Sequence, residues 1–200
     1  VALQTLTGIE IDFSVCPDEA QNDSDAYRKV LDTISEPACS IVAVPDHLHY
    51  PVTEACLLAG LHALVVKPLT PTVQEGRKLI DLAMRNRLYG AVEFHKRWDR
   101  QNRLLRDEYQ SGNLGAPLYS WTEYSQRKSI PTQVFQSWVE QTNILQYLGV
   151  HYIDIVRFVT GAVPIRVISI GQNSWLKSKG IDALDSMQCL VEWITAEGLT

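Results

Sequence analysis

Residues 39–68 read CSIVAVPDHLHYPVTEACLLAGLHALVVKP, and this stretch decides the fold of the chain. Two short, continuous apolar runs, at residues 39–44 and 63–66, are typical of strands buried on both faces. Between them, residues 53–61 have helical spacing, and Gly60 is placed to close that helix. A strand, a helix and a second strand joined by short loops predict a parallel βαβ unit with a right-handed crossover.

The alternation of helix and strand continues on both sides of this stretch. Residues 25–34 show a helical apolar stripe, residues 70–87 a helix opened by Pro71, and residues 91–94 a third strand. We therefore expect residues 1–97 to be the C-terminal part of a parallel, doubly wound α/β domain.

The pattern changes near Arg97–Trp98. Beyond this point the expected elements are a helix at 99–111, a turn at 112–117, a half-buried strand at 118–125, a helix at 143–160 closed by Gly161, and strands at 163–172 and 187–194. Residues 98–200 therefore predict an α+β domain with an open, mainly antiparallel sheet.

Composition narrows the classes of function. The net charge of −5 and pI near 5.5 argue against a nucleic-acid or membrane-surface protein. No apolar run reaches the ~18 residues of a membrane span, and no signal peptide opens the chain. The four cysteines lack CxxC spacing, and Cys39 and Cys56 sit in apolar stretches typical of a core, so we expect a reduced, cytoplasmic protein. Because the chain opens at Val1 without methionine and stops just after a predicted strand, we expect it to be a fragment.

Residues able to carry chemistry follow the first two predicted strands. Asp46, His47 and His49 come after one strand and Lys67 after the next, and open α/β sheets bind ligands beyond the carboxyl ends of their strands. A cis bond between Lys67 and Pro68 would turn the amine into that crevice. The alternatives are that Lys67 is a solvated surface charge and that the histidines are only polar residues leading into a helix.

A second candidate group lies on the predicted helix at residues 143–160. His151 and Asp154 are one turn apart on a helix that is apolar on most sides, so they must be paired or face a cavity. The alternative is a His151–Asp154 hydrogen bond that only ties the helix down. An imidazole and an amine that meet in one pocket would supply the proton transfer that alcohol–carbonyl redox chemistry needs.

Metal and phosphate sites are not indicated by the sequence. It contains neither HExxH nor a dense cluster of Cys, His and acidic residues. Gly112 and Gly115 lie between a helix and an alternating run, which is typical of a turn rather than of a phosphate loop.

Five segments in register resemble the Gfo/Idh/MocA family of oxidoreductases. They are AVPDHLHYP at 43–51, similar to the family's TPNxxH; AGLHALVVKPL at 59–69, similar to AGKHVxxEKPL; FHKRW at 94–98; SGNLG at 111–115; and LGVHYID at 148–154, similar to DxGxHxxD. The likeness covers roughly residues 25–198.

This resemblance implies a Rossmann domain that binds NAD or NADP and a second domain that binds substrate and packs through its sheet into homodimers or homotetramers. It also implies hydride exchange with a sugar, a polyol or a related cyclic alcohol. The implied roles are catalysis for Lys67 and His151; cofactor binding for Pro45, Asp46, His49, Lys67 and Pro68; and formation of the substrate pocket for Arg97, Tyr147 and Asp154.

Three departures from the family pattern stand out. No GxGxxG turn occurs, so the helix N-terminus that would hold a pyrophosphate is missing. The family glutamate before the lysine is Val66, and the family aspartate four residues before the histidine is Tyr147, which cannot hold a negative charge at neutral pH. Losing both acids favours the alternative of a non-catalytic homologue that senses sugars or nucleotides. The acid that would meet the cofactor ribose is also unassigned, with Asp12 and Asp18 as candidates.

Overall fold

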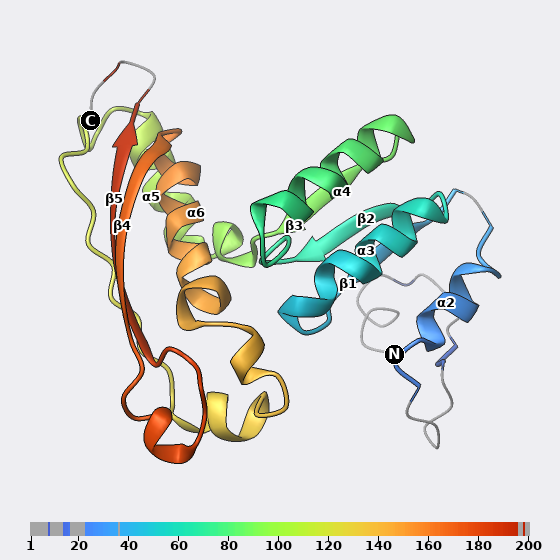
Figure 1. Ribbon diagram of the computed structural model, residues 1–200. Coiled ribbons are helices and arrows are strands. Elements are labelled where there is room, and N and C mark those ends of the chain that lie inside the picture. The colour runs from blue at the N-terminus through green and yellow to red at the C-terminus, as the bar shows by residue number, and fades with distance from the viewer. Residues whose placement is uncertain (1–7, 9–13, 17–22, 36, 196–197, 199–200) are drawn as a thin grey trace. The chain divides into compact units, whose positions relative to one another are not determined.

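The computed structural model describes residues 8, 14–16, 23–35, 37–195 and 198 (Figure 1). The chain divides into two compact units, residues 1–38 and 39–200, and each is described by itself. The domain boundary predicted near Arg97–Trp98 falls inside the second unit and stays a prediction. Asp12 and Asp18 lie outside the described residues.

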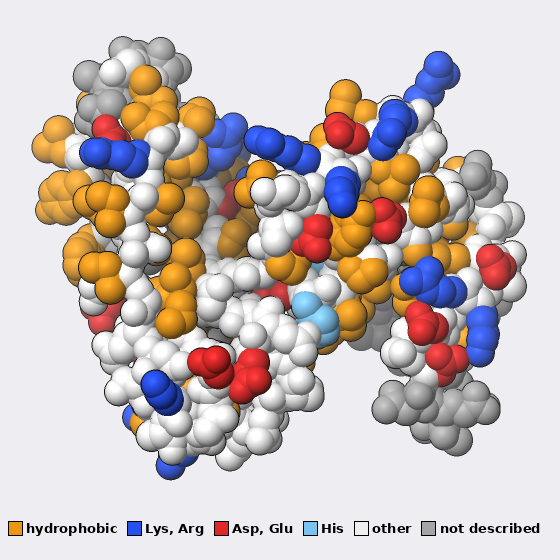
Figure 2. Space-filling view, in the orientation of Figure 1, with side chains coloured by type: hydrophobic (Ala, Val, Ile, Leu, Met, Phe, Trp, Pro, Cys, Tyr) orange, Lys and Arg blue, Asp and Glu red, His pale blue; other side chains and the backbone are white. Residues whose placement is uncertain are grey.

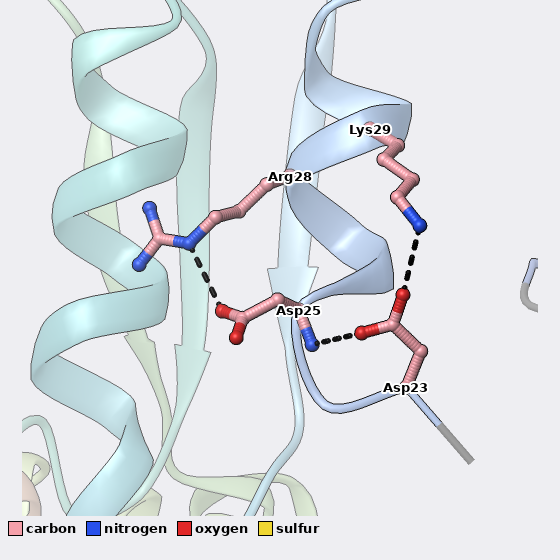
Figure 3. Close-up of polar contacts among 4 residues, drawn as sticks. All are labelled: Asp23, Asp25, Arg28 and Lys29. Atoms are coloured by element: carbon pink, nitrogen blue, oxygen red, sulfur yellow. Dashed lines mark hydrogen bonds and ion pairs between the residues drawn. The ribbon is translucent and has the colours of Figure 1, made fainter.

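The first unit contains the helix α2 (Ala26–Leu31), within the helix predicted at 25–34. Just before it, Asp23 accepts a hydrogen bond from the backbone N–H of Asp25 at 3.0 Å and pairs with Lys29 at 2.9 Å, while Asp25 pairs with Arg28 at 3.1 Å (Figure 3). The hydrogen bond from Lys29 lowers the pKa of Asp23. These pairs are solvent-exposed, so they organise the start of the helix and contribute little stability.

The second unit begins with a three-stranded sheet of β1 (Cys39–Val42), β2 (His62–Val66) and β3 (Gly90–Glu93), in the order β1-β2-β3. Both pairings are parallel, with Ile41 opposite Leu64 and Leu64 opposite Ala91. The prediction of a parallel sheet built from βαβ units is confirmed.

A short 3₁₀ turn, η1 (Asp46–Leu48), and the helix α3 (His49–Leu58) join β1 to β2. Gly60 closes α3 as predicted, with a φ of 81° that a side chain would disfavour. Its N–H bonds to the carbonyl of Leu57, and the N–H of Leu61 bonds to the carbonyl of Cys56, which is the Schellman pattern.

The helix α4 (Val73–Arg85) joins β2 to β3 and begins later than predicted. Thr72 is extended and forms a capping box with Glu75: each side chain accepts the other's backbone N–H, at 3.2 Å. This reciprocal pair fixes the first turn after Thr72, so Pro71 precedes the helix instead of opening it.

The core of this sheet lies against α3 and α4, where Leu57, Ala63, Leu79 and Ala83 pack together. Cys56 is buried as predicted, but the prediction that β1 is buried on both faces is wrong: Cys39 is exposed and Ile41 is 70% exposed. Cys39 and Ile41 point to the same face of β1, and the described residues leave that face uncovered.

The rest of the second unit consists of helices and turns, an irregular segment between Gln110 and Ile130, and a final antiparallel strand pair. The elements are η2 (His95–Trp98), α5 (Arg100–Gln110), η3 (Ile130–Val134), η4 (Val139–Gln141), η5 (Leu145–Gly149), α6 (Val150–Thr160), β4 (Val163–Gln172), η6 (Lys177–Lys179) and β5 (Ser186–Ile194). The helix predicted at 143–160 is present, although its first turn, η5, is a π-helical one, and Gly161 ends α6 with a φ of 73°.

The strand predicted at residues 118–125 is absent. This segment forms no strand, and Leu118, Tyr119 and Trp121 are 84–91% exposed. An alternating pattern of apolar and polar residues indicates only which face of a strand would be exposed to solvent. A strand also needs a neighbour to complete its hydrogen bonds, and among the described residues this segment pairs with none.

β4 and β5 form the predicted antiparallel pair, from Val163 opposite Ile194 to Gln172 opposite Ser186. Hydrophobic side chains gather along this ribbon in Figure 2, including Ile168, Ile170 and Leu190, each more than half exposed. A separate apolar cluster lies at one end of this part of the unit, formed by Phe135, Val139, Leu176 and Ala183. In the part of the chain that the structure describes, no helix has the length and apolar character that crossing a membrane requires.

We expect Thr72→Ala to lower the free energy of unfolding by about 1 kcal/mol, because it leaves the Glu75 N–H without its cap. Gln74→Ala, an exposed change in the same turn, is the matched control and should stay within about 0.5 kcal/mol of wild type. Urea unfolding followed by circular dichroism measures both. Equal effects of the two substitutions would show that the capping box does not stabilise α4.

Candidate active site

A cavity of about 620 Å³ lies beyond the carboxyl ends of β1 and β2. From the sheet side it is lined by Pro45, Asp46, His49 and Lys67. From the other side it is lined by Tyr147 and His151 of η5 and α6. The two groups of candidate residues, far apart in sequence, therefore share one cavity.

Lys67 is buried in this cavity, with 7% of its surface exposed, so the alternative that it is a surface charge is wrong. Its Nζ donates a hydrogen bond to the backbone carbonyl of Tyr147 at 2.5 Å and lies 4.2 Å from the centre of the Tyr147 ring. Burial lowers the pKa of Lys67, which enlarges the share of neutral amine. The Lys67–Pro68 peptide bond is cis, which is the possibility that the sequence raised.

His49 braces the two strand ends against each other. It is 1% exposed, and its ring nitrogens contact the carbonyl oxygens of Val44, at 2.9 Å, and of Pro68. Both ring nitrogens are thus engaged by backbone. His49 holds the wall of the cavity in shape, whereas Pro68 contributes the carbonyl and is not itself in the lining.

Asp46 is a buried carboxylate on the wall of the same cavity, 3% exposed. Its Oδ2 accepts a hydrogen bond from the hydroxyl of Thr142 at 2.6 Å. This bond ties η1 to the segment before η5, and sequence inspection did not single out Thr142.

His151 is 3% exposed, and its Nδ1 is buried without a hydrogen-bond partner among the described residues. Burial, followed by the charges of Lys67, His95 and Lys96, lowers the pKa of His151 to about 4. At neutral pH the ring is therefore uncharged, with one nitrogen free to accept a proton.

Asp154 does not bond to His151, so the alternative of an internal His–Asp tie is wrong. Its carboxylate instead forms a bidentate pair with Arg97, at 2.7 Å to Nε and 2.5 Å to Nη2. Asp154 is 8% exposed, and neither member of the pair is in the lining of the cavity. The pair links the end of η2 to α6 next to the cavity.

The structure adds residues that the sequence did not single out. The cavity is also lined by His95, Lys96, Tyr124, Gln126, Trp138 and Tyr152. The ring centres of His95 and His151 are 4.4 Å apart, and those of Tyr124 and Tyr152 are 5.4 Å apart. His95 and Lys96 follow β3 after one intervening residue, so the same rule about strand ends that drew attention to Lys67 applies to them.

No metal centre is evident in the described ranges, since nowhere in them do three His, Cys, Asp or Glu side chains gather as a metal ion requires. What the cavity offers is a neutral imidazole, a buried amine and a buried carboxylate. These groups are suited to moving a proton to or from a ligand hydroxyl.

Comparison with known proteins gives a family match over part of the chain. Residues 12–94 match the family model GFO_IDH_MocA, described as an oxidoreductase family with an NAD-binding Rossmann fold.

Several curated proteins are similar over most of the chain. Scyllo-inositol 2-dehydrogenase (NADP(+)) of Bacillus subtilis is 28% identical over 161 residues, 76% of this chain and 44% of that protein. Levoglucosan dehydrogenase of Pseudarthrobacter phenanthrenivorans is 26% identical over 180 residues, 84% of this chain and 45% of that protein. The chain thus spans less than half the length of these relatives.

Solved structures share the fold. The inositol dehydrogenase homologue of Azotobacter vinelandii, complexed with NADH and myo-inositol, superposes with a TM-score of 0.75 at 22% identity, covering 84% of this chain and 45% of that one. Myo-inositol 2-dehydrogenase of Lactobacillus plantarum gives a TM-score of 0.73 at 18% identity, covering 86% and 51%.

We expect the His151 ring to stay neutral down to about pH 4, because its pKa is lowered by burial and by neighbouring positive charges. A pH titration of the imidazole resonances, assigned with His151→Gln, measures this directly. A midpoint at pH 6 or above would contradict the environment described.

We also expect Arg97→Met to lower the free energy of unfolding by about 2–3 kcal/mol, since it leaves the carboxylate of Asp154 buried without its charge partner. The double variant Arg97→Met/Asp154→Asn removes both charges and should recover part of this loss. Urea unfolding measures both. If the double variant has a clearly lower free energy of unfolding than Arg97→Met alone, the two side chains do not stabilise the protein as a pair.

Proposed function

Over residues 12–94 the chain carries the Rossmann domain of the Gfo/Idh/MocA oxidoreductase family, and on this premise we propose that the protein is an NAD- or NADP-dependent oxidoreductase. Its substrate is a sugar, a polyol or a related cyclic alcohol, and hydride moves between the nicotinamide and the carbon that bears the hydroxyl. The single observation that carries the proposal is that His151 and Lys67 line one cavity at the carboxyl ends of parallel strands.

The residues present suit the nicotinamide end of such a cofactor. The cavity opens where α/β sheets bind nucleotides, and Pro45, Asp46 and Lys67 line its sheet side. We propose that these residues border the cofactor, with His49 and Pro68 fixing the wall through their mutual contact. The pyrophosphate turn GxGxxG does not occur in this sequence, so this chain's own contribution is to the reacting end.

When bound, the nicotinamide supplies or takes up the hydride. In oxidation of the alcohol, the neutral ring of His151 takes the hydroxyl proton as hydride leaves the carbon, and in reduction the protonated ring returns it. The amine of Lys67, held by the carbonyl of Tyr147, donates a hydrogen bond to the reacting oxygen and stabilises the negative charge that develops there.

Tyr147 is proposed to contact substrate, because it lines the cavity directly under Lys67. Arg97 and Asp154 are proposed to support the substrate pocket by holding α6, and thus His151, in place. We further propose a cytoplasmic protein that forms homodimers or homotetramers through the β4–β5 sheet. Its four free cysteines support a reducing compartment, and the exposed apolar ribbon supports the packing of copies.

The alternative is a non-catalytic sensor that has the same fold and binds a sugar or a nucleotide without turning it over. Catalysis is favoured by the buried Nδ1 of His151, which has no partner among the described residues and shares a cavity with an amine. It is also favoured by relatives that are named dehydrogenases. A panel of sugars and polyols, assayed by the absorbance of reduced nicotinamide with the protein at its full natural length, separates the two. Cofactor binding without turnover of any of them would support the sensor.

We expect His151→Ala to lower turnover by about 10²–10⁴-fold, the usual contribution of a general acid or base. His62→Gln is the matched control, because His62 lies at the amino end of β2, where its Nδ1 accepts the N–H of Tyr89, and its loss should leave turnover within about twofold. Steady-state kinetics on the same substrate measure both. A wild-type rate for His151→Ala would remove the imidazole from the proposed chemistry.

A further inference from the structure

Asp46 and Lys67 are opposite charges that are both buried in the wall of one cavity, 3% and 7% exposed. A buried carboxylate is costly unless it is compensated, and the hydrogen bond from Thr142 satisfies only part of its capacity. Asp46 forms no ion pair with another residue in the part of the chain described. Its charge is therefore available to act across the cavity.

The other groups that face Lys67 leave Asp46 as its main counter-charge. They are the carboxylate of Glu93 on β3, the side chains of His95 and Lys96 on η2, the phenols of Tyr124 and Tyr147, and the imidazole of His151 on α6. Glu93 is the second acid, but it pairs with His95 at 3.0 Å and is 28% exposed, so solvent screens it more. The residue before Lys67 is Val66, and the ring beneath its amine is uncharged.

We propose that the Asp46 carboxylate, fixed by Thr142, is the counter-charge that keeps Lys67 protonated and so sets the alkaline limit of the reaction. The first part of this proposal concerns Lys67 itself, and the second rests on the proposed function. Asp46 is then a positioning residue that acts through Lys67, in addition to bordering the cofactor.

The electrostatics of the cavity agree with this role. Burial lowers the pKa of Lys67, while the charge of Asp46, followed by that of Glu93, raises it. After burial, the charge of Asp46 also raises the pKa of Tyr147. The carboxylate thus favours a positive amine and an uncharged phenol on the two sides of the same contact.

The test is the titration of the Lys67 amine by heteronuclear NMR in the cofactor-free protein, with the resonance assigned by Lys67→Arg. Asp46→Asn removes the charge but keeps an oxygen that can accept the Thr142 hydroxyl. The midpoint should move to lower pH, with the neutral fraction at a fixed pH rising on the order of threefold to tenfold, as expected for two opposite charges that share one cavity without forming a direct ion pair. Glu93→Gln removes the same charge from the neighbouring strand and should give a smaller shift in the same direction.

An unchanged Lys67 midpoint in Asp46→Asn, or a shift in Glu93→Gln that equals or exceeds it, would overturn the proposal. If Asp46→Asn does not fold, Thr142→Val decides. Thr142→Val keeps the Asp46 carboxylate but removes the hydroxyl that fixes it, so the Lys67 midpoint should again move to lower pH. An unchanged midpoint would contradict the proposal. In the active protein, Asp46→Asn should move the alkaline limb of the pH–rate profile to lower pH. If no substrate turns over, the proposed function fails while the titration still decides the role of Asp46.

Discussion

The buried ammonium group of Lys67 is the constraint on which the rest of the site depends. An amine with 7% of its surface exposed must find acceptors inside the protein, and it finds one in the backbone carbonyl of Tyr147. That bond joins the carboxyl end of β2 to the turn before α6, so the position of His151 follows from it. The bonds from Thr142 to Asp46 and from Arg97 to Asp154 reinforce the same connection from two other points.

Apolar packing holds the helices on the sheet, whereas hydrogen bonds hold the polar residues of the site. Leu57 and Leu79 pack with small apolar residues and hold α3 and α4 against the sheet. The strand ends, by contrast, are held almost entirely by hydrogen bonds, with His49 touching two carbonyl oxygens at once. Such a rim keeps polar groups fixed around a cavity that a ligand can enter, which is the arrangement that differential binding of a transition state requires.

The parallel sheet was predictable from the sequence because local signals agreed there. Continuous apolar runs, Gly60 after a helix and a change of pattern beyond Trp98 each reflect the physics of a few neighbouring residues. The same local rules misplaced the start of α4, which is set by the capping box of Thr72. They also predicted a strand at 118–125 that pairs with no neighbour in the described residues. Strand pairing is non-local, and polarity alone cannot report it.

Part of the cavity lining could also be predicted from the sequence, because Lys67 and Asp46 come just after predicted strands. The hydrogen-bond partners of the site residues could not be predicted. Asp154 pairs with Arg97 and not with His151 of its own helix, and Thr142 belongs to no motif that would identify it as the partner of Asp46. Burial of Lys67 likewise depends on residues about eighty positions away. Side-chain partners that are set by tertiary approach leave no trace in local spacing.

Three polar bonds in or beside the cavity also bear on how the chain folds. They join residues separated by 57, 80 and 96 positions, so each closes a long loop before it contributes any stabilisation. The βαβ sheet needs far shorter loops, so it is positioned to form first during synthesis, with the cavity completed only after α6 has emerged. Until then the Lys67 amine stays hydrated, and the cavity is among the last parts of this protein to form.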